Sequence, residues 1–278
     1  MPSKPARAPV LTTVASTEWL TPSLVRITVE GEGLAGFPVG EFTDHYVKLQ
    51  FPPPGADYAV PFDPAEIRAS RPREQWHRQR TYTVRAFDPE GPRLTIDFIV
   101  HGEDGIAGPW AAAARPGDPL QLVGPGGAYA PDPEADWHLL AGDEAVLPAA
   151  AVALARMPAG APVIALFEVE DEREQLDLAG PGDLRLTWLH RRGRERSPEP
   201  LLDAVRGLDL PPGRGQAFVH GEAGMVRELR RHLANERGIA LADLSATGYW
   251  KHRRTEEGWR EDKPEWKRQA ELDVRPGT

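Results

Sequence analysis

The segment from Gln79 to Phe87 brings together an aromatic ring, a hydroxyl group and two fixed positive charges, at Arg80, Tyr82, Thr83 and Arg85. On one extended strand, the ring can cover a planar heterocycle and the hydroxyl can bond a ring nitrogen. A guanidinium can hold a phosphate through two parallel hydrogen bonds. These contacts suit a flavin nucleotide. Taken alone, the segment fits an ordinary strand with a solvated polar edge better, because short motifs recur by chance.

A glycine-containing turn follows the next apolar strand, within the stretch from Asp97 to Asp118. The turn contains Gly102, Gly105 and Gly108, and an alanine-rich helix is predicted to begin near Pro109. Free N–H groups at such a helix start can bind an anion such as a pyrophosphate. A plain strand–turn–helix connection with a proline in the first helical turn fits equally well.

A third candidate site ends the first apolar strand of the second half, at Gly142, Asp143 and Glu144. Ligands of open α/β sheets bind beyond the carboxyl ends of the strands. The dinucleotide fingerprint GxGxxG is absent, and two adjacent carboxylates repel a pyrophosphate. A nicotinamide or ribose contact is therefore more consistent with this turn than a phosphate contact. An ordinary strand–helix turn is at least as consistent with it.

Near the C-terminus, the aromatic residues Tyr249 and Trp250 precede four basic or potentially basic residues, 251–254. In an acidic chain this run forms a local positive centre that could attract an anionic ligand. A solvated charged face, balanced by Glu256 and Glu257, is the better interpretation of the run alone.

The first half of the chain has a β pattern. Short alternating or apolar runs, separated by proline and glycine clusters, predict strands at 24–29, 46–51, 80–87, 94–100 and 119–123. Several short strands at this spacing indicate an antiparallel barrel. The proline-rich and basic stretch Pro53–Gln79 is predicted to be a long loop.

The second half alternates between strand and helix patterns. Apolar runs predict strands at 137–141, 163–169, 184–189 and 217–220, and helices at 147–157, at 198–206 and around 226–233. This alternation indicates a parallel sheet covered on both faces. We place the boundary in a proline-rich segment, which gives domains at 1–131 and 132–278.

Composition narrows the function classes. The 278 residues contain no cysteine, which excludes disulfides, thiolate metal sites and a cysteine nucleophile. A net charge of −9 argues against a general nucleic-acid binder. No run approaches the roughly 20 apolar residues of a membrane span, and no secretory signal is evident, so we expect a cytoplasmic protein without membrane insertion. The histidines show no metal-ligand spacing.

Together these stretches resemble the siderophore-interacting protein family of FAD-dependent ferric-siderophore reductases. The family motifs R-x-Y-T-x-R, VHG, GPAS-x-W and RPGD correspond to residues 80–85, 100–102, 105–110 and 115–118. A GDE-x-x-LPA segment corresponds to residues 142–149, and GYW followed by basic residues corresponds to the chain from Gly248. Motif order and spacing agree over nearly the whole chain.

The resemblance implies a fold similar to ferredoxin–NADP reductases, with an N-terminal antiparallel FAD-binding β-barrel and a C-terminal parallel α/β nicotinamide-binding-like domain. It implies that Arg80, Tyr82 and Thr83 hold the flavin, with Arg85 near its phosphates. The remaining residues expected at the cofactors are Val84, Asp97, Val100, His101, Gly105, Ala107, Gly108, Trp110, Gly142, Asp143, Glu144, Tyr249 and Trp250. Lys48, Lys251 and Arg254 are expected to form a positive rim for the siderophore.

Three residues depart from the family pattern. Ile106 and Gly108 replace the proline and serine of GPAS, which removes a hydroxyl that could bond the pyrophosphate. Arg253 stands where the family usually has glycine, which puts the conformation of the C-terminal loop in doubt.

The expected function is flavin-dependent reduction of a ferric siderophore, with electrons from NADH, NADPH or a ferredoxin-like donor. No protein acid, base or nucleophile is expected to be indispensable, because the cofactor supplies the chemistry. Two alternatives remain: a general flavin or quinone reductase on the same fold, and a siderophore-binding protein without enzymatic activity.

Overall fold

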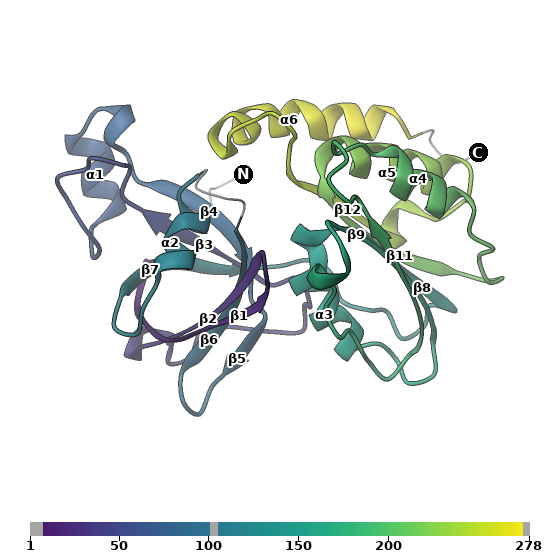
Figure 1. Ribbon diagram of the computed structural model, residues 1–278, viewed down its shortest axis with the longest axis horizontal. Helices are drawn as coiled ribbons and strands as arrows, with labels where there is room; N and C mark the ends of the chain where they lie inside the picture. Colours follow the sequence, from purple (N-terminus) through teal and green to yellow (C-terminus); the bar gives the residue numbers. More distant parts are fainter. Residues whose placement is uncertain (1–7, 101–104, 275–278) are drawn as a thin grey trace. The chain divides into compact units, whose positions relative to one another are not determined.

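The structure, a computed structural model, describes residues 8–100 and 105–274. Internal contacts divide the chain into two compact units, Met1–Ala128 and Tyr129–Thr278, called unit 1 and unit 2 here (Figure 1). The sequence places the boundary between residues 131 and 132, in the same proline-containing connection.

Unit 1 is built on one antiparallel sheet with the strand order β4-β3-β7-β1-β2-β6-β5. Alternation of apolar residues drives this sheet: Val25, Ile27 and Val29 of β2 are fully buried, whereas the residues between them are partly exposed. The strands are β1 (Val10–Thr21), β2 (Leu24–Glu30), β3 (Tyr46–Phe51), β4 (Arg78–Thr83), β5 (Ala86–Asp88), β6 (Arg93–Ile99) and β7 (Pro119–Gly126).

The sheet of unit 1 curls back on itself. β4 and β5 stand at opposite edges of the sheet, yet only Val84 and Arg85 separate them in the chain. The Val84 N–H donates to the His45 carbonyl beside β3, and the Arg85 N–H donates to the Thr95 carbonyl on β6. The predicted antiparallel, barrel-like architecture is therefore confirmed, although the strand pairing does not close the barrel. Helix α2 (Ala107–Ala113) packs against β2 and β6.

Two predictions for unit 1 are wrong. The single strand expected over 80–87 is broken after Thr83, because the chain turns there from one sheet edge to the other. The stretch Pro53–Gln79 is not a long loop throughout: it contains helix α1 (Pro64–Ser70) and a 3₁₀ turn, Arg73–Gln75. Asp63 caps α1 by accepting the Ala65 N–H at 2.7 Å, and proline occupies the first turn.

Unit 2 contains a parallel sheet with the strand order β10-β9-β8-β11-β12, as the sequence predicts. From β8, the chain adds β9 and β10 on one side of the sheet, and then adds β11 and β12 on the other side of β8. The strand order therefore reverses between β8 and β11. The strands are β8 (Trp137–Asp143), β9 (Pro162–Val169), β10 (Asp183–His190), β11 (Gly215–Glu222) and β12 (Leu244–Trp250).

Helices cover both faces of the unit 2 sheet (Figure 1). One apolar core joins the sheet to α3 (Leu147–Ala155). A second core, on the other face, includes side chains of α4 (Glu199–Arg206), α5 (Ala223–Asn235) and α6 (Glu256–Leu272). Trp259 and Trp266 of α6 are almost fully buried in this second core. In the described residues, no helix is both long and apolar enough to cross a bilayer.

Candidate cofactor site and nucleotide pocket

Strand β4 distributes its functional side chains over two faces of the sheet. In the β3–β4 register, Arg80 lies opposite the buried Leu49 and Tyr82 opposite the buried Val47. Directly opposed residues share a face, so Arg80 and Tyr82 lie on the core side. Thr83 lies on the other face, opposite the partly exposed Tyr46. The predicted ring and guanidinium therefore share one face, and the hydroxyl lies on the other.

The Tyr82 ring is held by aromatic packing inside unit 1. Its centroid lies 4.4 Å from that of Phe98 on β6, which in turn lies 5.7 Å from the ring of Trp110 on α2. Phe51 also contacts Trp110, with the ring centroids 5.5 Å apart. Tyr82 itself stays half-buried, so part of its ring is available to a ligand.

A buried ion-pair cluster lies close to the end of β4. Asp97 on β6 is opposite Arg26 on β2, and its side chain is 1% exposed. Arg26 Nε and Nη2 donate to the two Asp97 carboxylate oxygens at 2.7 and 2.8 Å. Arg85 Nε lies 3.9 Å from the same carboxylate. Two guanidiniums share this buried carboxylate, and the exposed Glu18 of β1 lies opposite Arg26 on its other side.

The two arginines of this cluster differ in the direction of their pKa shifts and in their hydrogen bonds. The hydrogen bond that Arg26 donates to Asp97 raises the pKa of Arg26, whereas burial and the charge of Arg26 lower the pKa of Arg85. In the part of the chain that the structure describes, the Arg85 guanidinium makes no hydrogen bond. Arg85 therefore offers a set of unused donors in a partly desolvated position, which is a favourable arrangement for binding an anion.

The other residues expected at the flavin have mixed environments. The Val84 side chain is buried in the core and its N–H is already bonded, so only its carbonyl could contact a ligand. Val100 and Trp110 pack at the edge of the same core. Gly105 has a φ of +84°, in the left-handed region, immediately before α2, which contains Ala107 and Gly108. His101 lies outside the described residues.

Lys48 projects from β3 on the same face as Thr83. It lies opposite Thr81 of β4 and Val123 of β7, and it is exposed. Within the described residues, Lys48 takes part in no ion pair. It therefore presents an uncompensated positive charge on the outer side of unit 1.

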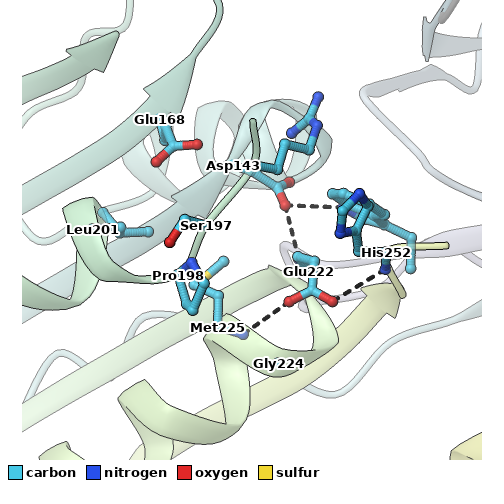
Figure 2. A pocket seen from close by; sticks show the side chains of 11 residues that line it. Asp143, Glu168, Ser197, Pro198, Leu201, Glu222, Gly224, Met225 and His252 are labelled. Carbon is cyan, nitrogen blue, oxygen red and sulfur yellow. Dashed lines mark hydrogen bonds between the residues drawn. The ribbon is translucent and has the colours of Figure 1, made fainter. Parts of the chain in front are cut away.

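Unit 2 has a cavity of about 210 Å³ at the carboxyl ends of its strands (Figure 2). Asp143, Glu168, Glu222 and Trp250 contribute to it from the ends of β8, β9, β11 and β12. The remaining lining residues come from the segment between β10 and α4, from α4 and α5, and from the segment after β12. They are Arg196, Ser197, Pro198, Leu201, Gly224, Met225 and His252. The cavity thus lies where α/β folds of this topology bind ligands.

Close strand packing places Asp143 at the base of this cavity. A Cβ atom on Gly142 would lie 2.1 Å from the His220 carbonyl oxygen, so glycine is required for β8 to approach β11 here. Asp143 accepts the N–H groups of Ala145 and Glu222 at 2.9 and 2.7 Å, and the Trp250 indole N–H at 2.9 Å. Burial and the Glu144 charge raise the pKa of Asp143 to about 7, although the backbone donors oppose this shift.

Glu144 is buried with opposite charges. Arg191 donates to its carboxylate at 3.1 and 3.3 Å, and Arg196 forms a second two-point ion pair with it. Burial alone would raise the pKa of Glu144, but the hydrogen bonds and charges of Arg196 and Arg191 lower it below its usual value. Glu168 also receives a 3.2 Å hydrogen bond from Arg191, yet burial still raises its pKa.

The C-terminal basic residues have acidic partners within unit 2. Arg254 forms a two-point pair with Asp262, both hydrogen bonds measuring 2.7 Å, and Lys251 Nζ lies 3.8 Å from the same carboxylate. Arg253 pairs with Glu195 at 2.8 Å and has a φ of +59°. That left-handed conformation explains why glycine suits this position in the family pattern.

The two aromatic residues before this basic run differ in their role. The Trp250 ring lies under the Arg196 guanidinium, 5.0 Å from its carbon, beside the cavity. Tyr249 contacts the His220 ring and accepts the Trp259 indole N–H on its carbonyl, so it belongs to the packing around α6.

Sequence reasoning did not identify Arg26, Arg191, Arg196 or Asp262. Arg26 interrupts an otherwise apolar strand, which is a detectable signal, but its partner is far away in the sequence. The acidic run 168–174 and the basic run 190–196 each follow an apolar strand. Two oppositely charged runs at neighbouring strand ends could have indicated the ion-pair network.

Comparison with known proteins identifies the family. The model of the siderophore-interacting FAD-binding domain matches residues 13–129, and that of the siderophore-interacting protein matches residues 135–253. Ferric vibriobactin reductase ViuB of Vibrio cholerae is 36% identical, covering 88% of this chain and 90% of its own length. The chain belongs to the siderophore-interacting protein family. The NADPH-dependent ferric-chelate reductase of Escherichia coli is 30% identical over 86% of this chain and 91% of its own.

Solved structures agree with this family membership. The siderophore-interacting protein SipS from Aeromonas hydrophila has a TM-score of 0.81 and 31% identity, covering 94% of this chain and 98% of its own. A ferredoxin–NADP⁺ reductase from Neisseria gonorrhoeae, at 13% identity and a TM-score of 0.61, covers 88% of this chain and all of its own and shares the fold. The predicted family and the predicted resemblance to ferredoxin–NADP reductases are both confirmed. Unit 1 contains the family's FAD-binding domain.

Proposed function

We propose that this protein reduces the ferric ion of a siderophore, using FAD bound to unit 1 and electrons from a reduced nicotinamide. Support comes from family membership, from the activities named for ViuB and the Escherichia coli enzyme, and from the guanidinium donors of Arg85 in unit 1. The observation that carries the proposal is the Arg26–Asp97–Arg85 cluster within the matched FAD-binding domain. It supplies the unused guanidinium donors of Arg85 in a partly buried position.

The residues of unit 1 fit an FAD molecule. Arg85 can donate to an oxygen of the pyrophosphate, and Arg80 can approach the same group from the core side of β4. The half-buried Tyr82 ring can support a flat heterocycle while Phe98 holds it in place. Thr83 can bond a polar atom at the edge of the ring. Asp97 keeps Arg26 and Arg85 close together despite their like charges.

Iron release follows from the chemistry of ferric chelates. Hard oxygen ligands hold Fe³⁺ tightly, and adding one electron gives Fe²⁺, which these ligands hold more weakly. When bound, FAD can accept two electrons from a donor and return them one at a time, so that one reduction of the cofactor converts two Fe³⁺ ions to two Fe²⁺ ions. The chain's residues bind and orient, and Lys48 can attract an anionic chelate.

The test uses the FAD-loaded protein without any nicotinamide. The bound cofactor is reduced anaerobically with light and a sacrificial donor, and a ferric siderophore is then added with a ferrous-specific chelator. We expect reoxidation of the cofactor with about two ferrous ions formed per FAD. Reoxidation by quinones or free flavin but not by ferric chelates would favour the general reductase. Binding of the ferric chelate without any electron transfer would favour the binding protein. Either result overturns the proposal.

A further inference from the structure

Two backbone N–H groups at the turn after β8 are already occupied by a side chain. In dinucleotide-binding sheets, N–H groups near this turn commonly receive the pyrophosphate. Here the carboxylate of Asp143 accepts the N–H of Ala145 at the start of the following helical turn and the N–H of Glu222 at the end of β11. The protein's own carboxyl group therefore stands where a ligand phosphate would otherwise bind. Figure 2 shows Asp143 and Glu222 together at the cavity.

The segment that follows β10, residues 191–196, contains four arginines with internal partners. Arg191 bonds Glu144 and Glu168, and lies 3.5 Å from Glu170. Arg192 pairs with Glu172, and Arg196 pairs with Glu144.

The fourth arginine of this segment is engaged by the backbone. Arg194 donates to the carbonyls of His190 and Arg191 at 2.8 and 2.9 Å. The carboxylates at these strand ends outnumber the arginines. They are Asp143, Glu144, Glu168, Glu170, Glu172 and Glu222. A phosphate added at Arg191, Arg192 or Arg196 would have to displace a carboxylate from the arginine and would then lie beside the displaced charge.

We propose that unit 2 selects a donor without a 2′-phosphate, so that NADH and not NADPH delivers the electrons. This inference rests on the proposed function, because it concerns the donor of that reaction. In sheets of this topology, an acidic residue near the second strand bonds the ribose hydroxyls of NAD, whereas an arginine accommodates the 2′-phosphate of NADP. Glu170 and Glu172 follow β9, the second strand of this sheet in chain order, and they pair with Arg191 and Arg192, two arginines that could otherwise serve NADP.

The arginine that is simplest to release is Arg192. Its pair with Glu172 is exposed on both sides, with 66% and 58% of the side chains accessible, so the substitution Glu172→Gln should leave the fold intact. The matched control is Glu265→Gln, which releases Arg268 from a comparable exposed pair on α6.

The experiment compares binding of ADP-ribose and 2′-phospho-ADP-ribose by calorimetry, and anaerobic flavin reduction by NADH and NADPH. We expect the wild-type chain to favour NADH by at least about tenfold in kcat/KM. Glu172→Gln should strengthen binding of the 2′-phosphorylated fragment by about three- to tenfold, with ADP-ribose nearly unchanged. Glu265→Gln should change neither ligand.

Failure of this inference is distinguishable from failure of the proposed function. A chain that reduces ferric siderophores after photoreduction but prefers NADPH contradicts the donor inference alone. A chain that reduces them but binds neither fragment contradicts the donor inference and the nicotinamide donor of the proposed function, and leaves the reduction of the siderophore standing. An unchanged ratio of the two fragments in Glu172→Gln also contradicts it. A chain that fails to reduce ferric chelates after photoreduction contradicts the proposed function, whatever its fragment preference.

Discussion

Each unit buries carboxylates beside arginines, but the balance of charge differs. In unit 1, the buried carboxylate of Asp97 faces both Arg26 and Arg85, and the Arg85 guanidinium makes no hydrogen bond among the described residues. In unit 2, Arg191 alone meets Glu144, Glu168 and Glu170, and Arg196 also pairs with Glu144. Unit 1 therefore leaves guanidinium donors unused, whereas unit 2 pairs Arg191 and Arg196 with its own carboxylates.

This difference matches what each unit would have to bind. A dinucleotide cofactor with a pyrophosphate requires unused cationic donors, which unit 1 offers in a partly buried position. A nicotinamide donor that binds only transiently needs weaker contacts. Carboxylates at strand ends can accept hydrogen bonds from ribose hydroxyls without binding the phosphates. Substitutions in the two units test this difference between unused and paired guanidinium groups.

The first variant removes the carboxylate of unit 1. Asp97→Ala leaves Arg26 and Arg85 close together without a counter-charge, and the loss of one partner from a buried ion pair costs about 3–5 kcal/mol of unfolding free energy. Urea denaturation measures the loss. The control is Glu30→Ala, which breaks an exposed pair with Arg93 on the same two strands and should cost less than about 1 kcal/mol. Equal losses of unfolding free energy in the two variants would show that the cluster around Asp97 contributes no more stability than an exposed ion pair.

The second variant concerns the buried carboxylate of unit 2. The pKa of Asp143 is raised from 3.8 to about 7 in the folded chain, so between these values the folded state binds its proton more tightly than the unfolded state. Stability from this group is therefore present at low pH and lost as the pH rises from about 4 to 7, by up to about 4 kcal/mol. Asp143→Asn should remove this slope. If the unfolding free energy of the wild-type chain and of Asp143→Asn changes with pH in the same way, the raised pKa of Asp143 is refuted.

The third variant tests the use of the free donors. Arg85→Ala should weaken FAD binding by about 10- to 100-fold, the range expected for losing a charged hydrogen bond to a phosphate. Quenching of flavin fluorescence on titration measures the dissociation constant. Arg93→Ala, on the neighbouring strand, serves as the control and should bind FAD like the wild-type chain. An unchanged affinity of Arg85→Ala for FAD would show that Arg85 does not bind the cofactor.

The fourth comparison concerns the rim expected around the siderophore. Lys48 is unpaired within the described residues, whereas Lys251 shares Asp262 with Arg254. Lys48→Ala should therefore raise the KM for an anionic ferric chelate by about three- to fivefold at low salt, and Lys251→Ala by less than about twofold. Steady-state kinetics at several salt concentrations separate the two. Equal effects would mean that Asp262 does not neutralise Lys251.

Local patterns made much of the fold predictable. The strand 46–51 and the alanine-rich helix after residue 147 follow from apolar periodicity, and the alternation of strands and helices fixes the parallel sheet. Strand β1 was not predicted, because threonine and serine interrupt its apolar pattern. Helix α6 was interpreted only as a charged run, although Trp259 and Trp266 are seven residues apart and mark one helix face.

The site was less predictable, because its contacts depend on strand register. The motif around Tyr82 was recognisable from the sequence, but its division over two faces follows from pairing with β3. The partnership of Arg26 with Asp97 depends on the β2–β6 register, which a single sequence does not specify. The occupied donors around Asp143 depend on β8 and β11 meeting at Gly142.

The central claim is that unit 1 binds FAD through an aromatic surface and guanidinium donors. Titration of the cofactor-free protein with FAD, followed by visible absorption, tests it most directly. We predict saturable binding of one FAD per chain, with a shifted and structured flavin spectrum, because Tyr82 would cover part of the ring. A spectrum that remains that of free FAD at every protein concentration would contradict the claim.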